Sequence, residues 1–171
     1  MKNKETQSKT PTLVYCDCFV TDSNLNILNA SLIHSTHRTL PKHKLLQHTL
    51  VQNYFPGCVV MFNQQLKEVT GTIYEKCEMH DWWLTQVASY CGKIYFYDQA
   101  LHCYRQHENN TIGAQQQSGK WKKRFLKIFK FSALRNNWRN FQKIIILQAE
   151  ELQRRYSDQQ KCDVVSRFIS I

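Results

Sequence analysis

The order of hydrophobic and polar residues along the chain predicts strands that alternate with helices. β-branched and aromatic side chains over residues 12–20 predict a first strand, and residues 27–31 predict a short second one. Leucines at near-helical spacing predict a short helix over residues 43–51, which the Pro56-Gly57 pair ends.

The clearest helix is predicted in the middle of the chain. Before it, the apolar run 58–63 predicts a buried strand that leads into a short helix near residues 64–69. Apolar side chains then fall on one face of residues 81–91, and Gly92 is well placed to stop that helix.

Two further strands are predicted over residues 93–97 and 101–105, so strands and helices alternate as in an α/β sandwich. After Gly119 the pattern changes to interleaved basic and aromatic residues, followed by a long helical stretch to about Tyr156.

Charge divides the 171-residue chain into two parts. Residues 1–117 contain 10 basic and 9 acidic side chains, whereas residues 118–171 contain 13 basic and 4 acidic ones. Nearly all of the formal net charge of +10 therefore lies in the last third. We expect one α/β domain over 1–117 and a basic amphipathic helical tail over 118–171 that serves for interaction.

The cysteines favour reduced thiols in a cytosolic protein. The chain has seven of them, an odd and scattered set, and its first residues lack the apolar stretch of a signal peptide. A structural zinc through His80, His102 or Cys103 is disfavoured, because no second Cys or His pair has zinc-like spacing. No run reaches the roughly 20 apolar residues that a membrane span needs.

Asp81 is the first candidate for chemistry. At a helix start it is most simply an N-cap, but a carboxylate that reaches a cleft is also a candidate general base. Trp82 and Trp83 follow it, and successive helical positions lie about 100° apart. They therefore cannot both face one side of the core, and one is expected to line a cavity or an interface.

Four segments in order resemble the acceptor half of family 2 glycosyltransferases, especially the rhamnosyltransferase-like enzymes of surface polysaccharide synthesis. The resemblance covers about residues 12–114, and its segments are Tyr15-Cys16-Asp17 with Asp22, the run 55–63, Met79 to Trp83, and Tyr104 to His107 with Asn109, Asn110 and Gly113. It implies a truncated mixed sheet of the GT-A type, flanked by helices and followed by the basic helical segment.

The resemblance also implies roles. Asp81 would activate the acceptor hydroxyl for inverting transfer from a nucleotide-sugar, and Trp82 and Trp83 would shape a site for a saccharide or lipid-linked acceptor. Gly57 and Cys58 would lie at the substrate. The residues placed near the diphosphate are Arg105 and, as a ligand of Mg²⁺ or Mn²⁺, His107. For these two, a surface arginine and an exposed loop histidine remain the alternatives.

The nucleotide-binding half of such an enzyme has no counterpart before Thr12, and Asp17 and Asp22 are too far apart for an Asp-x-Asp metal motif. We therefore expect a chain that is inactive alone, and a sheet with an exposed edge that favours association. The alternative function is a non-catalytic remnant that binds a membrane surface or another protein.

The basic segment has three interpretations. Trp121, Phe125, Ile128 and Phe129 would form one apolar stripe among lysines, typical of a helix at an anionic membrane surface. Packing of that stripe on the chain's own domain is the second interpretation, and nonspecific nucleic-acid binding is the third, although no specific nucleic-acid motif is present. We prefer attachment through residues 120–156 to the inner face of the cell membrane.

Overall fold

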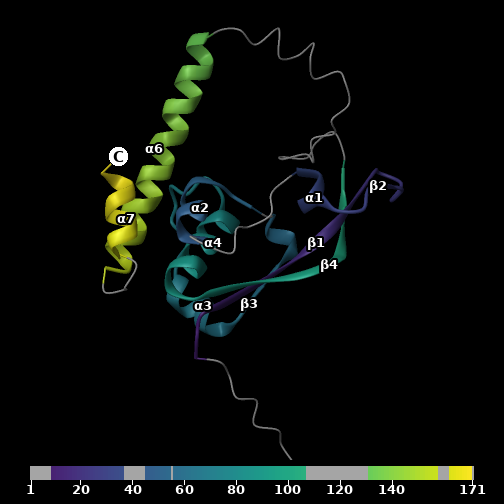
Figure 1. Ribbon diagram of the computed structural model, residues 1–171, viewed down its shortest axis with the longest axis horizontal. Helices are drawn as coiled ribbons and strands as arrows, with labels where there is room; N and C mark the ends of the chain where they lie inside the picture. Colours follow the sequence, from purple (N-terminus) through teal and green to yellow (C-terminus); the bar gives the residue numbers. More distant parts are fainter. Residues whose placement is uncertain (1–8, 37–44, 55, 107–130, 158–161, 171) are drawn as a thin grey trace, which may run out of the picture.

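The predicted α/β class is confirmed. The computed structural model has a four-stranded mixed sheet with helices packed against it (Figure 1). The residues that it describes are 9–36, 45–54, 56–106, 131–157 and 162–170.

Strand β1 (Thr12–Thr21) is the centre of the sheet. It pairs in parallel with β4 (Lys93–Arg105), from Thr12 opposite Lys93 to Thr21 opposite Arg105. Its other side pairs antiparallel with β3 (Val60–Phe62) near its start and with β2 (Ile27–Asn29) near its end. The predictions of the first two strands are thus confirmed.

Strand β4 replaces two predicted strands. Asp98 and Gln99 interrupt the aromatic pattern, which predicted a break after Tyr97. The chain instead remains extended, and the pairing register shifts as Cys16 pairs with Tyr97 and Asp17 with Ala100. The extra residues of β4 are absorbed in this irregularity, so pairing with β1 maintains a strand that local sequence did not predict.

The three predicted short and central helices are confirmed as α2 (Leu45–Val51), α3 (Gln64–Thr70) and α4 (His80–Cys91). A further short helix, α1 (Leu32–Thr36), was not predicted.

The buried strand predicted over 58–63 is partly wrong. The 3-10 turn η1 (Gly57–Val59) takes up its start. The short β3 follows, in which Met61 is 77% exposed and Phe62 48% exposed. An apolar run does not specify which of its faces the fold covers.

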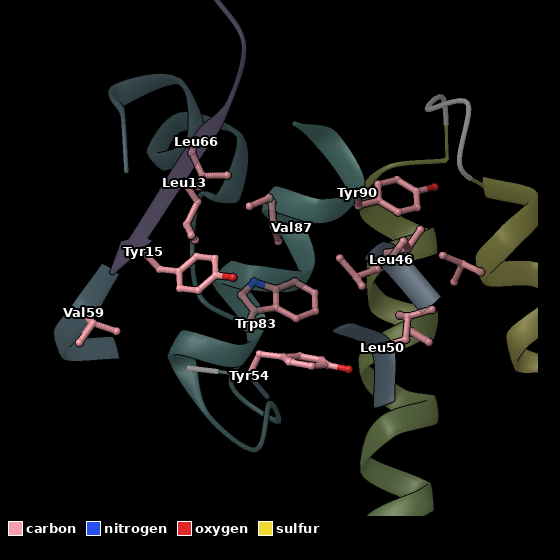
Figure 2. Packing of buried hydrophobic residues seen from close by; sticks show 14 of the residues in the cluster. Leu13, Tyr15, Leu46, Leu50, Tyr54, Val59, Leu66, Trp83, Val87 and Tyr90 are labelled. Carbon is pink, nitrogen blue, oxygen red and sulfur yellow. The ribbon is translucent and has the colours of Figure 1, made fainter. Parts of the chain in front are cut away.

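Helices α6 (Phe131–Arg155) and α7 (Cys162–Ile169) contribute to the same core as the sheet, although 118–171 was predicted to be a separate tail. Ala149, Leu152 and Val165 belong to the hydrophobic cluster that contains Leu13 and Trp83. Figure 2 shows Trp83 among labelled side chains of β1, α2 and α4. The boundary at 117/118 and the apolar stripe from Trp121 to Phe129 lie outside the described residues.

Buried polar groups fix how α6 lies on α4. The Gln148 side chain is fully buried; its Oε1 accepts from the backbone N–H of Glu78 at 2.8 Å and its Nε2 donates to Gln86 Oε1 at 3.3 Å. Gln86 Nε2 in turn donates to the Thr49 carbonyl at 3.2 Å. Displacing α6 would leave several of these groups unpaired in an apolar interior, so the network specifies one docking position.

Gly92 stops α4 as predicted, but for a different reason. Its φ of −152° is not left-handed, so the stop does not depend on the left-handed conformation in which a glycine often ends a helix. A Cβ built on Gly92 would lie 2.0 Å from the carbonyl oxygen of Pro11, an oxygen that accepts from the Lys93 N–H at 2.9 Å. A glycine is required because β1 begins against this turn.

One face of the sheet carries exposed apolar side chains from three strands. Val14 pairs with Met61 on one side and with Tyr95 on the other, so these three lie in a row; they are 37%, 77% and 51% exposed. Tyr97, two residues farther along β4, is 49% exposed. Among the described residues, no strand pairs with the outer edge of β4. An open strand edge beside exposed apolar side chains is a template for association.

We expect concentration-dependent association that Tyr95→Lys with Tyr97→Lys reduces, because charges on an edge oppose strand pairing. Sedimentation velocity over a range of protein concentrations measures it. Val69→Lys, a similar change at a 37% exposed residue of α3, is the control and should leave association unchanged. Equal effects of both variants would contradict a role for β4.

Candidate functional site

The carboxylate of Asp81 connects three parts of the chain. Asp81 lies in the first turn of α4, and the N-cap is Met79, so its prediction as the N-cap is wrong. Its Oδ2 accepts from the Gly57 N–H at 2.8 Å, and its Oδ1 accepts from Asn53 Nδ2 at 3.1 Å and from the Trp82 N–H at 2.7 Å. The residue is 5% exposed. An ionised carboxylate suits a position where both oxygens accept.

Gly57 and Cys58, which the resemblance assigns to substrate binding, lie beside Asp81. A Cβ on Gly57 would be 3.2 Å from Asp81 Cβ and 3.3 Å from His80 Nε2, so the absence of a side chain lets η1 approach the start of α4. The pKa of the Cys58 thiol is raised, first by local burial and then by the Asp81 charge. Cys58 is therefore a neutral thiol near pH 7 rather than a thiolate nucleophile.

Trp82 and Trp83 are both buried, on different sides of α4. Trp83 is in the core, with the Tyr74 ring 5.5 Å away and the Arg155 guanidinium 5.3 Å from its own ring centre. Trp82 lies at the contact of α4 with α2 and α6: its Nε1 donates to the Thr49 carbonyl at 2.6 Å, and its ring stacks on Phe141 at 6.0 Å. The interface expected for one tryptophan is thus internal to the chain.

Trp82→Phe should lower the free energy of unfolding by about 1 kcal/mol, because a hydrogen bond and some packing are lost. The loss should stay this small because the Thr49 carbonyl still accepts from Gln86 Nε2. Urea unfolding followed by far-UV circular dichroism measures it. Trp138→Phe, at a tryptophan that is 59% exposed, should change stability by less than about 0.5 kcal/mol. A larger loss of stability for Trp138→Phe than for Trp82→Phe would contradict the conclusion that Trp82 is the tryptophan that packs in the interior.

Arg105 ends β4, where it pairs with Thr21 at the end of β1, and its side chain is exposed. The carboxyl ends of the two parallel strands thus lie together. Tyr104, one residue before it, is near η1: its pKa is raised first by burial and then by Cys58. His107, the predicted metal ligand, lies outside the described residues.

The sequence did not indicate that Asp17 and Asn53 hold other segments of the chain in place by hydrogen bonds. Asp17 is buried, and its Oδ1 accepts from the N–H groups of Leu32 at 3.1 Å and Ile33 at 3.2 Å, while its Oδ2 accepts from the Ser31 hydroxyl. It therefore holds the start of α1 against β1. The available signal was a lone acidic residue inside an apolar strand.

Asp22 has a local role. It accepts from the N–H groups of Asn24 and Asn26 and from the Asn26 amide, and these hydrogen bonds lower its pKa. It thus closes the turn between β1 and β2.

The described residues do not offer a metal site. Within those ranges, no three His, Cys, Asp or Glu side chains lie together as a metal-binding group. The divalent metal of the resemblance therefore has no ligand set in this part of the chain. Nor is any described helix long and apolar enough to cross a membrane.

Comparison with other proteins gives no relative for this arrangement. No protein-family model, no curated protein and no solved structure matches the chain.

Proposed function

We propose that the chain is the acceptor-side part of an inverting glycosyltransferase similar to family 2, with Asp81 as the base for the acceptor hydroxyl. The observation that carries the proposal is the fixed Asp81 carboxylate. The Gly57 N–H and the Asn53 amide hold it at the start of α4, next to the exposed residues His80 and Cys58. A catalytic base must be held in a defined position before its substrate arrives.

In the proposed reaction Asp81 takes the proton of an acceptor hydroxyl. The hydroxyl oxygen forms its bond to the anomeric carbon of the donor sugar while the bond from that carbon to the nucleotide diphosphate breaks. The configuration inverts, and the diphosphate leaves with the electron pair. Arg105 would neutralise its charge. Asp81 is only 5% exposed, whereas its neighbours His80 and Cys58 are exposed. The acceptor would therefore approach the carboxylate from the side of His80 and Cys58.

A second candidate function is a non-catalytic binding module. The observation that favours it is that both oxygens of Asp81 already accept hydrogen bonds within the chain. In this case Asp81 is a structural anchor between α4, η1 and the end of α2, and function depends on exposed surfaces.

Calorimetric titration with nucleoside diphosphates, with and without Mg²⁺ or Mn²⁺, separates the two functions. Binding, together with release of diphosphate from a nucleotide-sugar when a saccharide or lipid-linked acceptor is added, supports the transferase. If no nucleoside diphosphate binds under any of these conditions, the transferase proposal is wrong for this chain and the binding module is favoured.

A further inference from the structure

Strand β4 has a neighbouring strand on one side only. Within the described ranges, β1 pairs along one edge of β4, and no strand pairs along the other (Figure 1). The first part of β4 pairs regularly with β1 from Lys93 to Tyr97, and the first register shift follows Tyr97. Residues 93–97 therefore form a regular open edge, which we call the edge segment. An edge of this kind presents backbone N–H and C=O groups that another strand can pair with.

The hydrogen bonding of the edge segment shows which of its residues face outward. The Lys93 N–H donates to the Pro11 carbonyl at 2.9 Å, so the backbone groups of Lys93 point to β1. Successive residues of a strand direct their N–H and C=O groups to opposite edges. Ile94 and Phe96 therefore present their backbone groups to the open edge.

A second copy of the chain can supply the strand that this edge lacks. When two identical strands pair antiparallel about a twofold axis, residues at equal distances from the axis lie opposite one another. With the axis at Tyr95, Ile94 of one copy lies opposite the partner's Phe96. Both have outward-facing backbone groups, as a hydrogen-bonded antiparallel pair requires. This register also pairs the whole edge segment, whereas an axis at Ile94 or Phe96 would pair less of it.

The side chains of the edge segment are compatible with this register. Tyr95 would lie opposite the partner's Tyr95, on the face that carries Val14 and Met61. The exposed row of these three side chains would then continue from one copy into the other, and aromatic pairs across two strands are stabilising. Lys93 would lie opposite the ring of the partner's Tyr97 and would meet no like charge.

Charge also favours a protein strand as the occupant of this edge. Residues 1–117, which include the whole sheet, contain 10 basic and 9 acidic side chains, so two copies that meet here bring little net charge together. The edge segment itself contains one lysine beside one aliphatic and three aromatic side chains. An anionic surface such as a nucleic acid would find one cation in it.

We propose that two copies of the chain pair through residues 93–97, with a twofold axis at Tyr95, and form a symmetric dimer with one continuous sheet. The paired segment is short, so the dimer should exchange with the monomer. The inference is independent of the transferase proposal, because it depends only on β4 and its neighbours in the sheet.

Trapping by disulfide formation in the full chain tests the register. In an antiparallel pair, opposite residues that are not hydrogen-bonded have Cα atoms about 4.5 Å apart, which suits a disulfide. After mild oxidation, Tyr95→Cys should therefore give a covalent dimer in which position 95 of one copy is linked to position 95 of the other. Mass spectrometry of the linked peptides identifies the bond, and sedimentation equilibrium of the unchanged protein should show a monomer and dimer in exchange.

Tyr97→Cys is the matched control. Tyr97 is 49% exposed and Tyr95 51% exposed, so the new thiols are equally accessible. In the proposed register, however, the two copies of position 97 lie about 13 Å apart along the strands, too far for a disulfide. The oxidised unchanged protein shows the background from the native cysteines, of which Cys103 is exposed on the same strand.

A link at position 95 without one at position 97 supports the proposal. Equal linkage of both variants overturns it, because contact would then be random. A protein that stays monomeric at every concentration overturns it and leaves the edge to a strand of another protein. A bond between the Cys103 residues of two copies without one at position 95 also overturns it, since the axis would then lie in the second part of β4.

Discussion

Asp81→Asn is expected to lower both the stability of the protein and any transfer that it catalyses. The asparagine amide offers one acceptor oxygen where the carboxylate offered two, so the N–H of Gly57 or the amide of Asn53 is left without its acceptor. A buried donor left unpaired costs about 1–3 kcal/mol, which urea unfolding measures. Loss of a general base should lower the transfer rate about 10²–10⁴-fold, measured as diphosphate release.

Asn53→Ala separates the two effects. It removes one hydrogen bond to the Asp81 carboxylate, which still accepts from the N–H groups of Gly57 and Trp82, so stability should fall by a similar amount while transfer falls much less than in Asp81→Asn. If Asp81→Asn kept full transfer activity, Asp81 would not be the base. If Asn53→Ala lost as much activity as Asp81→Asn, the Asp81 carboxylate would only hold the local structure and would not be the base.

Gly92→Ala is expected to have the largest effect on stability. The added methyl group would lie 2.0 Å from the Pro11 carbonyl oxygen and 2.8 Å from its carbon, and these are backbone atoms that no rotamer change can move. Relief requires moving the start of β1 away from the turn between α4 and β4. We expect a loss of more than about 4 kcal/mol, a large part of the stability of a small domain, seen as a lower urea midpoint.

Gly71→Ala provides the comparison. Gly71 has a φ of +57°, but a Cβ there would meet nothing within 4 Å. Gly71→Ala should therefore lower the free energy of unfolding by about 1–3 kcal/mol, because alanine is strained in this backbone conformation. A Gly92→Ala protein as stable as Gly71→Ala would contradict the close approach of Pro11.

Local patterns predicted what is locally determined. The strand at residues 12–20 and the helix at 81–91 carry their periodicities within themselves, and both are present. The continuity of β4 depends on its pairing with β1. The exposure of Met61 depends on whether another part of the chain covers that face of the sheet. Neither dependence is visible in a short window of sequence.

The candidate site was predicted in the same partial way. The position of Asp81 near a helix start is a local property, whereas its partners come from a turn and a loop that fold up to it. Asn53 carried no signal, because a loop asparagine has no periodicity and no distinctive spacing. Both Trp82 and Trp83 are buried because the chain packs on two sides of α4, which the helical period alone cannot specify.

The central position of β1 also affects how the protein is made. Among the described strands, β1 is synthesised before the others but pairs mainly with the last of them, β4, from Thr12 opposite Lys93, and the core also needs Val165 of α7. At usual synthesis rates the nascent β1 waits on the order of 5–20 s for its parallel partner. Such distant pairing slows folding. During that interval the apolar strand is a segment that a chaperone would bind.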